Sequence, residues 1–260
     1  MEPNNPKGKR DQVGELFKSV SEDAIAGASN PLSRFPAFQP RMEILPPSQR
    51  ALWPSLRSLA GMGFVLYGGT AIALRLGHRE SVDFDFFTER PFDHQSLMSA
   101  LPFASGALVL QEDPNTLTLS VTLPDHPDHP VKVSFFGGLT MGRIGMPERT
   151  DDGVILAASL TDLLANKLKV IHDRLEKKDY LDIHGLLSFG CSLPDALAGA
   201  PALFGKAFQP RVALGAMTYF KGGNLGELSP EVQKNLIGAA AAVESVPPNP
   251  SVSPVLGVTP

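Results

Sequence analysis

Two carboxylates spaced for one face of a strand are the residues of this chain best suited to chemistry. Asp83 and Asp85 alternate with Val82, Phe84 and Phe86 in the run VDFDFF. Successive side chains of a strand point to opposite faces, so we expect both carboxylates on one face and the apolar side chains on the other. Paired carboxylates suit Mg²⁺, which takes oxygen ligands and shares them with substrate phosphates. We therefore predict a Mg²⁺ site at Asp83 and Asp85.

A glycine turn precedes this pair. The apolar run Phe64–Tyr67 predicts a short buried strand, and Gly68-Gly69-Thr70 follows it and opens a helix-favouring segment that ends at Gly77. Glycine lets a phosphate approach the backbone, and a helix start supplies free N–H groups and a positive dipole end. With the carboxylates, the turn predicts a site for a nucleoside triphosphate. The alternatives are a plain strand–helix turn and a solvated pair of acids.

A second charged group lies in the later run NKLKVIHDRLEKKDYLDI. On one continuous helix, Lys167, Arg174 and Lys178 would lie within about 20° of one line, because a helix turns once in 3.6 residues. A kink near Leu175–Lys177 would change this arrangement. A lysine and an arginine on one face suit the β- and γ-phosphates of a nucleotide, and a solvated helix face is the alternative.

In this order and spacing, the motifs resemble a known family. GGTAIALRLGHRESVDFDFF, followed by DLLANKLKVIHDRLEKKDYLDI, is similar to the AbiEii/AbiGii toxin family, to which the MenT toxins belong. That family is a branch of the DNA-polymerase-β-like nucleotidyltransferase superfamily. The resemblance covers roughly Leu52 to Ala240. It implies an α+β fold, with a polymerase-β-like mixed sheet and flanking helices followed by a helical C-terminal domain. Family membership alone does not settle activity, because function depends on the site.

The resemblance also implies a catalytic set. Family members pair a lysine at the place of Lys167 with an aspartate at the place of Asp182, and both are needed for activity. Catalysis is therefore expected from these two residues together with the metal ligands Asp83 and Asp85. Asp179 competes with Asp182 for the acidic role.

The expected nucleotide contacts combine the glycine turn with nearby cations. In the family, a Ser or Thr at the place of Thr70 contacts the triphosphate, and a helix N-cap is the alternative role for this residue. Arg79 would steer a phosphate or pair with Asp83. We interpret His78 as structural or substrate-orienting rather than as a metal ligand. The full nucleotide-binding set is Gly68, Gly69, Thr70, Arg79, Lys167 and Arg174.

One position departs from the wider superfamily pattern. Many members carry a third carboxylate on the strand that corresponds to VKVSFF, where this chain has Ser134, with Lys132 on the same face. Serine is a poor Mg²⁺ ligand. Either two strand acids plus Asp182 suffice, or a metal position is weak. In the second case the chain would be a catalytically weakened nucleotide-binding module or antitoxin partner.

The resulting hypothesis is a Mg²⁺-dependent nucleotidyltransferase that moves NMP from an NTP to an acceptor. The resemblance suggests the toxin of a type IV toxin–antitoxin (abortive infection) system, with a tRNA 3′ end as candidate acceptor and a cognate antitoxin as partner. A small-molecule nucleotidyltransferase of the antibiotic-modifying type is a further alternative. It would need an acidic acceptor pocket, which Glu112, Asp125 and Asp128 could supply.

Composition limits the classes to consider. The 260 residues suit one or two domains, and 43% hydrophobic content is ordinary for a globular protein. No apolar run reaches the length of a membrane span. The single cysteine, Cys191, excludes an intrachain disulfide, and the polar run MEPNNPKGKRDQ lacks a signal peptide's apolar stretch, so we expect a cytoplasmic protein. The net charge of −4 argues against a broadly basic nucleic-acid surface.

Strands crowd the first half of the chain and helices the second, which favours an α+β catalytic domain followed by a helical domain. We expect a loosely ordered arm over 1–45 with a helix near Gln12–Ala26, a catalytic domain over 46–157, a helical domain completing the site over 158–245, and a disordered Pro-rich tail over 246–260. Further patterns predict helices over 47–62, 92–101, 159–174, 178–189, 193–199, 211–220 and 230–243, strands over 107–112, 116–123 and 131–136, and a polar loop over 125–130.

Overall fold

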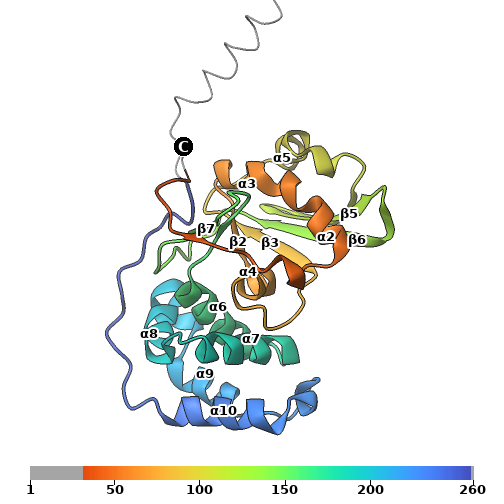
Figure 1. Ribbon diagram of the computed structural model, residues 1–260. Helices are drawn as coiled ribbons and strands as arrows, with labels where there is room; N and C mark the ends of the chain where they lie inside the picture. Colours follow the sequence, from red (N-terminus) through yellow and green to blue (C-terminus); the bar gives the residue numbers. More distant parts are fainter. Residues whose placement is uncertain (1–31, 259–260) are drawn as a thin grey trace, which may run out of the picture. The chain divides into compact units, whose positions relative to one another are not determined.

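The structure is a computed structural model that describes residues 32–258 (Figure 1). The residues from Phe35 onward form one compact unit. The expected helix near Gln12–Ala26 lies outside the described residues. The expected division between 46–157 and 158–245 stays a prediction. Among the described residues, no helix is long and apolar enough to cross a membrane.

Eight strands of the described chain form one mixed sheet in the order β1-β7-β8-β2-β3-β6-β5-β4. The central strand β3 pairs antiparallel with β2 and parallel with β6. The strands are β1 (Ala37–Phe38), β2 (Val65–Tyr67), β3 (Asp83–Phe87), β4 (Leu108–Asp113), β5 (Thr116–Leu123), β6 (His126–Phe136), β7 (Glu148–Thr150) and β8 (Leu156–Ala157).

Alternation along β3 gives the sheet two chemically different faces. Phe84 and Phe86 are buried, whereas Asp83, Asp85 and Phe87 are only half-buried on the opposite face. The period-two prediction is therefore confirmed for Phe84 and Phe86, whereas Val82 precedes the strand, is 59% exposed and lines the same cavity as the carboxylates. The apolar face packs into the core, where Phe86 stacks on Phe135 of β6 with ring centroids 5.9 Å apart. The other face carries the carboxylates.

Helices provide the remaining elements of the described chain (Figure 1). The helix α4 starts directly after β2 and contacts β2, β3, α6 and α7, so it joins the sheet to the helices of the second half. The α-helices are α2 (Pro47–Leu52), α3 (Arg57–Gly61), α4 (Gly68–Leu76), α5 (His94–Ala100), α6 (Leu160–Asp173), α7 (Lys177–Ser188), α8 (Leu193–Phe204), α9 (Pro210–Met217) and α10 (Pro230–Ala241).

The charged run after residue 160 folds as two helices. Ser159 caps α6 by accepting a hydrogen bond from the Asp162 N–H, and the helix ends at Asp173, followed by the C-cap residue Arg174 with an extended backbone (φ −148°, ψ 156°). The helix α7 then begins at Lys177. The alternative of a break near 175–177 is therefore the one observed, and the two helices pack against each other.

The expected polar loop over 125–130 is wrong. The strand β6 begins at His126 and pairs with β5 from Leu123 onward, so only a short turn separates the two strands. On its other side, β6 pairs with β3 only from Lys132 onward. The outer part of β6 therefore has a free edge, where Pro127 and Pro130 are tolerated because no second neighbour needs their missing N–H groups.

The expected disorder of the tail is also wrong for its described residues, which extend to 258. Leu256 is fully buried, and its N–H donates to Glu89 Oε2 over 3.0 Å. Arg90 donates to the Val258 carbonyl oxygen over 2.6 Å. Backbone hydrogen bonds join Ser253 to Arg143. Proline content alone suggested disorder, but the apolar run at the end of the tail buries enough surface to order the segment.

Candidate active site

A cavity of about 300 Å³ gathers most of the predicted site residues. Its lining comes from the start of α4, the carboxylate face of β3, α6 and the start of α7. Of the predicted residues, all but Thr70 and Asp182 line it: Gly68, Gly69, Arg79, Asp83, Asp85, Lys167 and Arg174. Motifs far apart in the sequence therefore meet around one space.

The glycine turn forms the first turn of α4. Gly68 has a φ of +72°, and a Cβ atom there would lie 2.5 Å from Asp85 Oδ2. Only glycine satisfies both the left-handed backbone and this close approach. Tyr67 is the N-cap residue and makes no side-chain cap hydrogen bond. The first-turn N–H groups thus remain available to an anion, which the positive helix end also attracts.

The two carboxylates form an incomplete oxygen-ligand set. Burial raises the pKa of Asp85 above its ordinary value, and the nearby charge of Asp83 raises this pKa further. The cations of Lys132, Lys167 and Lys178 offset only part of the shift. Among the described residues, no group of three or more His, Cys, Asp or Glu could hold a metal. The pair fits a divalent cation that takes its other oxygens from a bound phosphate.

Ser134 lies where the register of the sheet predicts it. It pairs with Asp85 across β3 and β6, just as Lys132 pairs with Asp83, whose Oδ2 lies 4.0 Å from the Lys132 Nζ. The Ser134 side chain is buried, and its Oγ lies 3.4 Å from Thr118 Oγ1 on β5. A serine hydroxyl, and not a third carboxylate, thus lies beside Asp85 on the neighbouring strand.

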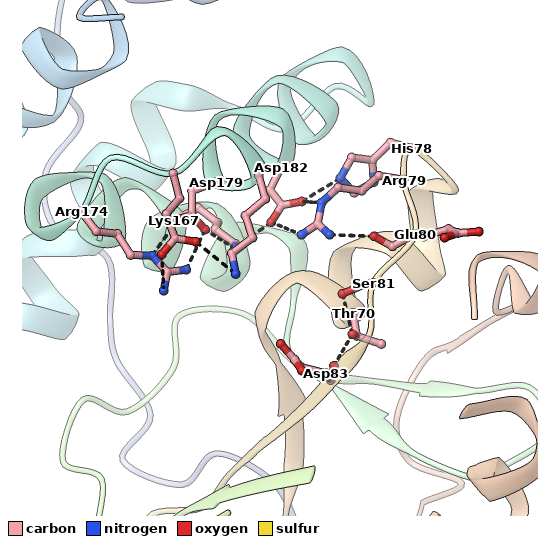
Figure 2. Close-up of polar contacts among 12 residues, drawn as sticks. Thr70, His78, Arg79, Glu80, Ser81, Asp83, Lys167, Arg174, Asp179 and Asp182 are labelled. Atoms are coloured by element: carbon pink, nitrogen blue, oxygen red, sulfur yellow. Dashed lines mark hydrogen bonds and ion pairs between the residues drawn. The ribbon is translucent and has the colours of Figure 1, made fainter. Parts of the chain in front are cut away.

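The structure does not place Thr70 in the cavity. Its side chain is buried, and its hydroxyl lies 2.7 Å from Ser81 Oγ and hydrogen-bonds the carbonyl oxygen of Asp83. Thr70 therefore joins α4 to the start of β3 and positions Asp83 (Figure 2). The N-cap alternative is not observed either, because Tyr67 occupies that position.

A buried ion cluster holds Lys167 at the cavity (Figure 2). The Lys167 Nζ lies 2.7 Å from Asp179 Oδ1 and 2.7 Å from Asp182 Oδ2, and both carboxylates are fully buried. An ammonium group has three hydrogens, so these two contacts leave one for a ligand. Lys167 itself lines the cavity, whereas neither aspartate does.

Each aspartate of the cluster also holds one arginine. Asp182 accepts from Arg79 Nε over 2.7 Å and from Arg79 Nη2 over 2.8 Å. Asp179 accepts from Arg174 Nε over 2.8 Å. The predicted pairing of Arg79 with Asp83 is therefore not observed. Both aspartates pair with cations that line the cavity, since Asp179 contacts Lys167 and Arg174 and Asp182 contacts Lys167 and Arg79.

The surroundings of Asp182 favour its ionised form. Burial alone would raise its pKa, but hydrogen bonds from His78 and Arg79 and the charge of Lys167 outweigh burial and hold the pKa well below the usual range. The His78 Nε2 lies 2.8 Å from Asp182 Oδ1, which agrees with the structural interpretation of this histidine. Asp182 thus contacts Arg79 and Lys167, which line the cavity, but does not line it itself.

Aromatic side chains that the sequence analysis did not assign to the site also line the cavity. Tyr67 stacks on Phe87 with ring centroids 4.7 Å apart, and Phe87 meets Phe136 edge-on at 5.3 Å. The alternation along the strand already indicated the position of Phe87, because every second residue from Asp83 onward lies on the same face as Asp83 and Asp85. These rings form an apolar wall beside the charged residues.

The acidic pocket of the small-molecule alternative does not form in this cavity. Glu112, Asp125 and Asp128 are absent from its lining. Glu112 instead pairs with His94 Nδ1 at 3.0 Å. Among the described residues, the acidic side chains that line the cavity are Glu80, Asp83 and Asp85.

We expect the buried cluster to make the fold sensitive to acid. The folded-state pKa values of Asp179 and Asp182 lie below their ordinary value. Their stabilisation is therefore complete above about pH 4 and is lost as the pH falls toward the folded-state values. Asp182→Asn should cost about 3–5 kcal/mol at pH 7, because it removes one charge of a buried network, and should flatten the pH dependence below pH 4. Urea unfolding between pH 3 and pH 7 measures both effects.

Asp173→Asn is the matched control for this prediction. Asp173 is 65% exposed and pairs with Lys169 on the surface of α6. Its substitution should change the unfolding free energy by no more than about 0.5 kcal/mol. If the unfolding free energy of Asp182→Asn had the same value and the same pH dependence as that of the native protein, the cluster would contribute no net stability.

Comparisons with known sequences identify a family and a relative. Residues 50–231 match the family described as nucleotidyl transferase AbiEii toxin, type IV TA system. An uncharacterised protein of Aquifex aeolicus (strain VF5) is 36% identical over 126 residues, which cover 48% of this chain and 57% of that protein. The alignment thus spans little more than half the length of this relative.

Solved structures are similar at low sequence identity. MenT4, a nucleotidyltransferase toxin of Mycobacterium tuberculosis H37Rv, is 14% identical with a TM-score of 0.50, over 75% of this chain and 83% of that chain. An antigenic nucleotidyltransferase-like protein of Paracoccidioides brasiliensis is 17% identical with a TM-score of 0.46, over 76% and 94%. The MenT4 likeness supports the expected fold class. The profile match covers more than half of the sequence, and the chain therefore belongs to the AbiEii nucleotidyl transferase toxin family.

Proposed function

We propose that this protein transfers a nucleoside monophosphate from an NTP to an acceptor hydroxyl and releases pyrophosphate, with Mg²⁺ as its metal. One observation carries the proposal. The Asp83–Asp85 pair, the open N-terminus of α4 and four cations line the same cavity, the cations being Arg79, Lys167, Arg174 and Lys178. Nucleotidyl transfer needs this combination, because positioning and charge neutralisation supply most of the catalysis in phosphoryl-group chemistry.

The chain's own residues divide the work of binding. The N–H groups of Gly68 and Gly69 would bind phosphate oxygens, and Arg79 and Lys167 would neutralise the β- and γ-phosphates. Asp83 and Asp85 would hold the metal. When bound, Mg²⁺ supplies charge neutralisation of the triphosphate and activation of the acceptor hydroxyl.

The aromatic wall would bind the base of the NTP. Tyr67, Phe87 and Phe136 line the cavity next to the carboxylate face of β3. Stacking of a base on an aromatic ring contributes about 1–3 kcal/mol and tolerates different bases. Broad NTP use with modest preferences follows from this wall.

The biological role that fits best is the toxin of a type IV toxin–antitoxin pair, as the family description states for its members. We propose a cognate antitoxin as partner and an RNA 3′ end, such as that of tRNA, as acceptor. A terminal hydroxyl needs only a short reach into the cavity. The net charge of −4 therefore does not exclude such a substrate, since a local group of cations suffices.

Incorporation of labelled nucleotide tests this function. Purified protein, each of the four α-³²P-labelled NTPs and total RNA are combined with Mg²⁺ or with a chelator. We expect Mg²⁺-dependent labelling of a discrete RNA fraction and release of pyrophosphate. Absence of labelling with all four NTPs, in a protein that still binds NTP, would favour the alternative of a catalytically weakened nucleotide-binding module. Ser134 is the residue that keeps this alternative open.

Ser134→Asp should create a stronger metal site. The added carboxylate would stand beside Asp85, so the protein should lose stability without metal through charge repulsion. Mg²⁺ should then raise its melting temperature by about 3 °C or more beyond the native shift, which corresponds to roughly tenfold tighter binding. Thermal melts with and without Mg²⁺ measure this. Ser134→Asn is the control, because asparagine has the size of aspartate and carries no charge. Equal Mg²⁺ shifts in both variants would place residue 134 outside the metal site.

A further inference from the structure

A second cavity, of about 520 Å³, adjoins the first. Val82 lines both cavities, and its side chain is 59% exposed. The other walls of the second cavity come from the start of α2, with Pro47 and Gln49, and from the outer part of β6, with Asp128, His129 and Pro130. The proposed function uses none of these residues.

Gln49 is the unusual residue of this second cavity. It is only 1% exposed, and neither Oε1 nor Nε2 of its side chain has a hydrogen-bond partner among the described residues. Buried amides are almost always hydrogen-bonded, because leaving both polar atoms unpaired is costly. A ligand in the cavity would supply the missing partners. An amide presents a donor and an acceptor side by side, which matches the edge of a nucleobase.

The two cavities differ in fixed charge. Arg79, Lys167, Arg174 and Lys178 line the first cavity, whereas no lysine or arginine of the described chain lines the second. Phosphates will therefore bind in the first cavity, and the second, whose lining includes the carboxylate of Asp128, suits a group without negative charge. Its proline walls offer rigid apolar surfaces against which a flat base can pack.

We propose that the second cavity binds the terminal nucleoside of the acceptor RNA and that Gln49 hydrogen-bonds the edge of its base. This inference rests on the proposed function. Val82 immediately precedes Asp83, and one strand residue spans only about 3.3 Å. A nucleoside whose base lies beyond Val82 thus presents its sugar hydroxyl close to the carboxylates and the α-phosphate. Gln49 is then a specificity residue for the acceptor.

Binding of free nucleosides tests the cavity independently of catalysis. Adenosine, cytidine, guanosine and uridine are titrated into the full chain without NTP, with saturation-transfer NMR as readout. We expect one base to be preferred, and Gln49→Met to weaken its binding about tenfold or more, as for loss of a bidentate base contact. The melting temperature of this variant should be unchanged or higher, because a buried unpaired amide is removed. Gln111→Met, on the exposed strand β4, is the matched control and should bind as the native protein does.

Transfer kinetics then test the role of the cavity. The substrates are short oligoribonucleotides that differ only in the terminal base. Gln49→Met should raise KM for the preferred acceptor about tenfold and leave KM for NTP unchanged. Transfer with an unchanged acceptor KM and base preference in Gln49→Met would overturn the inference while the proposed function stands. Nucleoside binding that depends on Gln49, in a protein that transfers nothing, would overturn the proposed function while the base site stands. Binding of no nucleoside by the native chain would overturn the inference.

Discussion

Asp83→Asn and Asp85→Asn are each expected to lower nucleotidyl transfer by on the order of 10³-fold or more, because metal-bound charge stabilisation contributes several kcal/mol to such reactions. Both carboxylates line the cavity, and asparagine keeps the volume while removing the charge. Single-turnover labelling at saturating NTP measures the loss. Asp113→Asn, on the exposed strand β4, is the control and should retain native turnover. Near-native turnover in either site variant would remove the two-carboxylate mechanism.

The Asp85→Asn variant should separate activity from stability. The pKa of Asp85 is raised in the folded state, chiefly by burial. A carboxyl with a raised pKa binds more protons when folded, so its ionisation destabilises the fold above that pKa, and this cost disappears as the pH falls. Asp85→Asn should therefore melt at a higher temperature than the native protein at pH 7 without metal. Inactivity combined with higher stability would mark Asp85 as a functional residue rather than a structural one.

The sequence predicted the parts of the site that depend on local pattern. Alternation along the run that contains Asp83 and Asp85 sets which side chains share a face, and the register then places Ser134 beside Asp85. The same parity applies to Phe87, so its place in the cavity wall was available from the sequence. Only Phe84 and Phe86, the even-numbered residues of β3, face the interior.

Roles that depend on contacts between distant segments were beyond the sequence. The pairing of Arg79 with Asp182 joins residues 103 positions apart, and Asp182, expected among the catalytic residues, does not line the cavity. Thr70 lies in the right motif, yet its hydroxyl hydrogen-bonds Ser81 and the Asp83 carbonyl oxygen, and the residue does not line the cavity. Gln49 belongs to no sequence motif. Its side-chain amide has no hydrogen-bond partner among the described residues, and it lies on α2, which packs against β6. Pattern identifies the strand and the turn, but tertiary packing decides which side chains reach a ligand.

Lys167→Ala should lower kcat/KM for NTP by about 10²–10³-fold, the loss expected when a preorganised charge contact to a developing phosphate charge is removed. Two buried carboxylates hold the ammonium group at the cavity, with one hydrogen left for phosphate. The variant should also lose about 3–5 kcal/mol of stability, because Asp179 and Asp182 lose a shared buried partner.

Activity of the Lys167→Ala protein must therefore be measured well below its melting temperature, with circular dichroism confirming the folded fraction in the same buffer. Lys206→Ala is the control, since Lys206 is exposed in the turn after α8 and lies outside the cavity lining. Its substitution should change kcat/KM by less than about twofold, because an exposed charge contributes little. A fully folded Lys167→Ala protein that uses NTP as well as Lys206→Ala does would show that the buried cluster serves stability alone. Phosphate binding would then have to depend on Arg79, Arg174 and the start of α4.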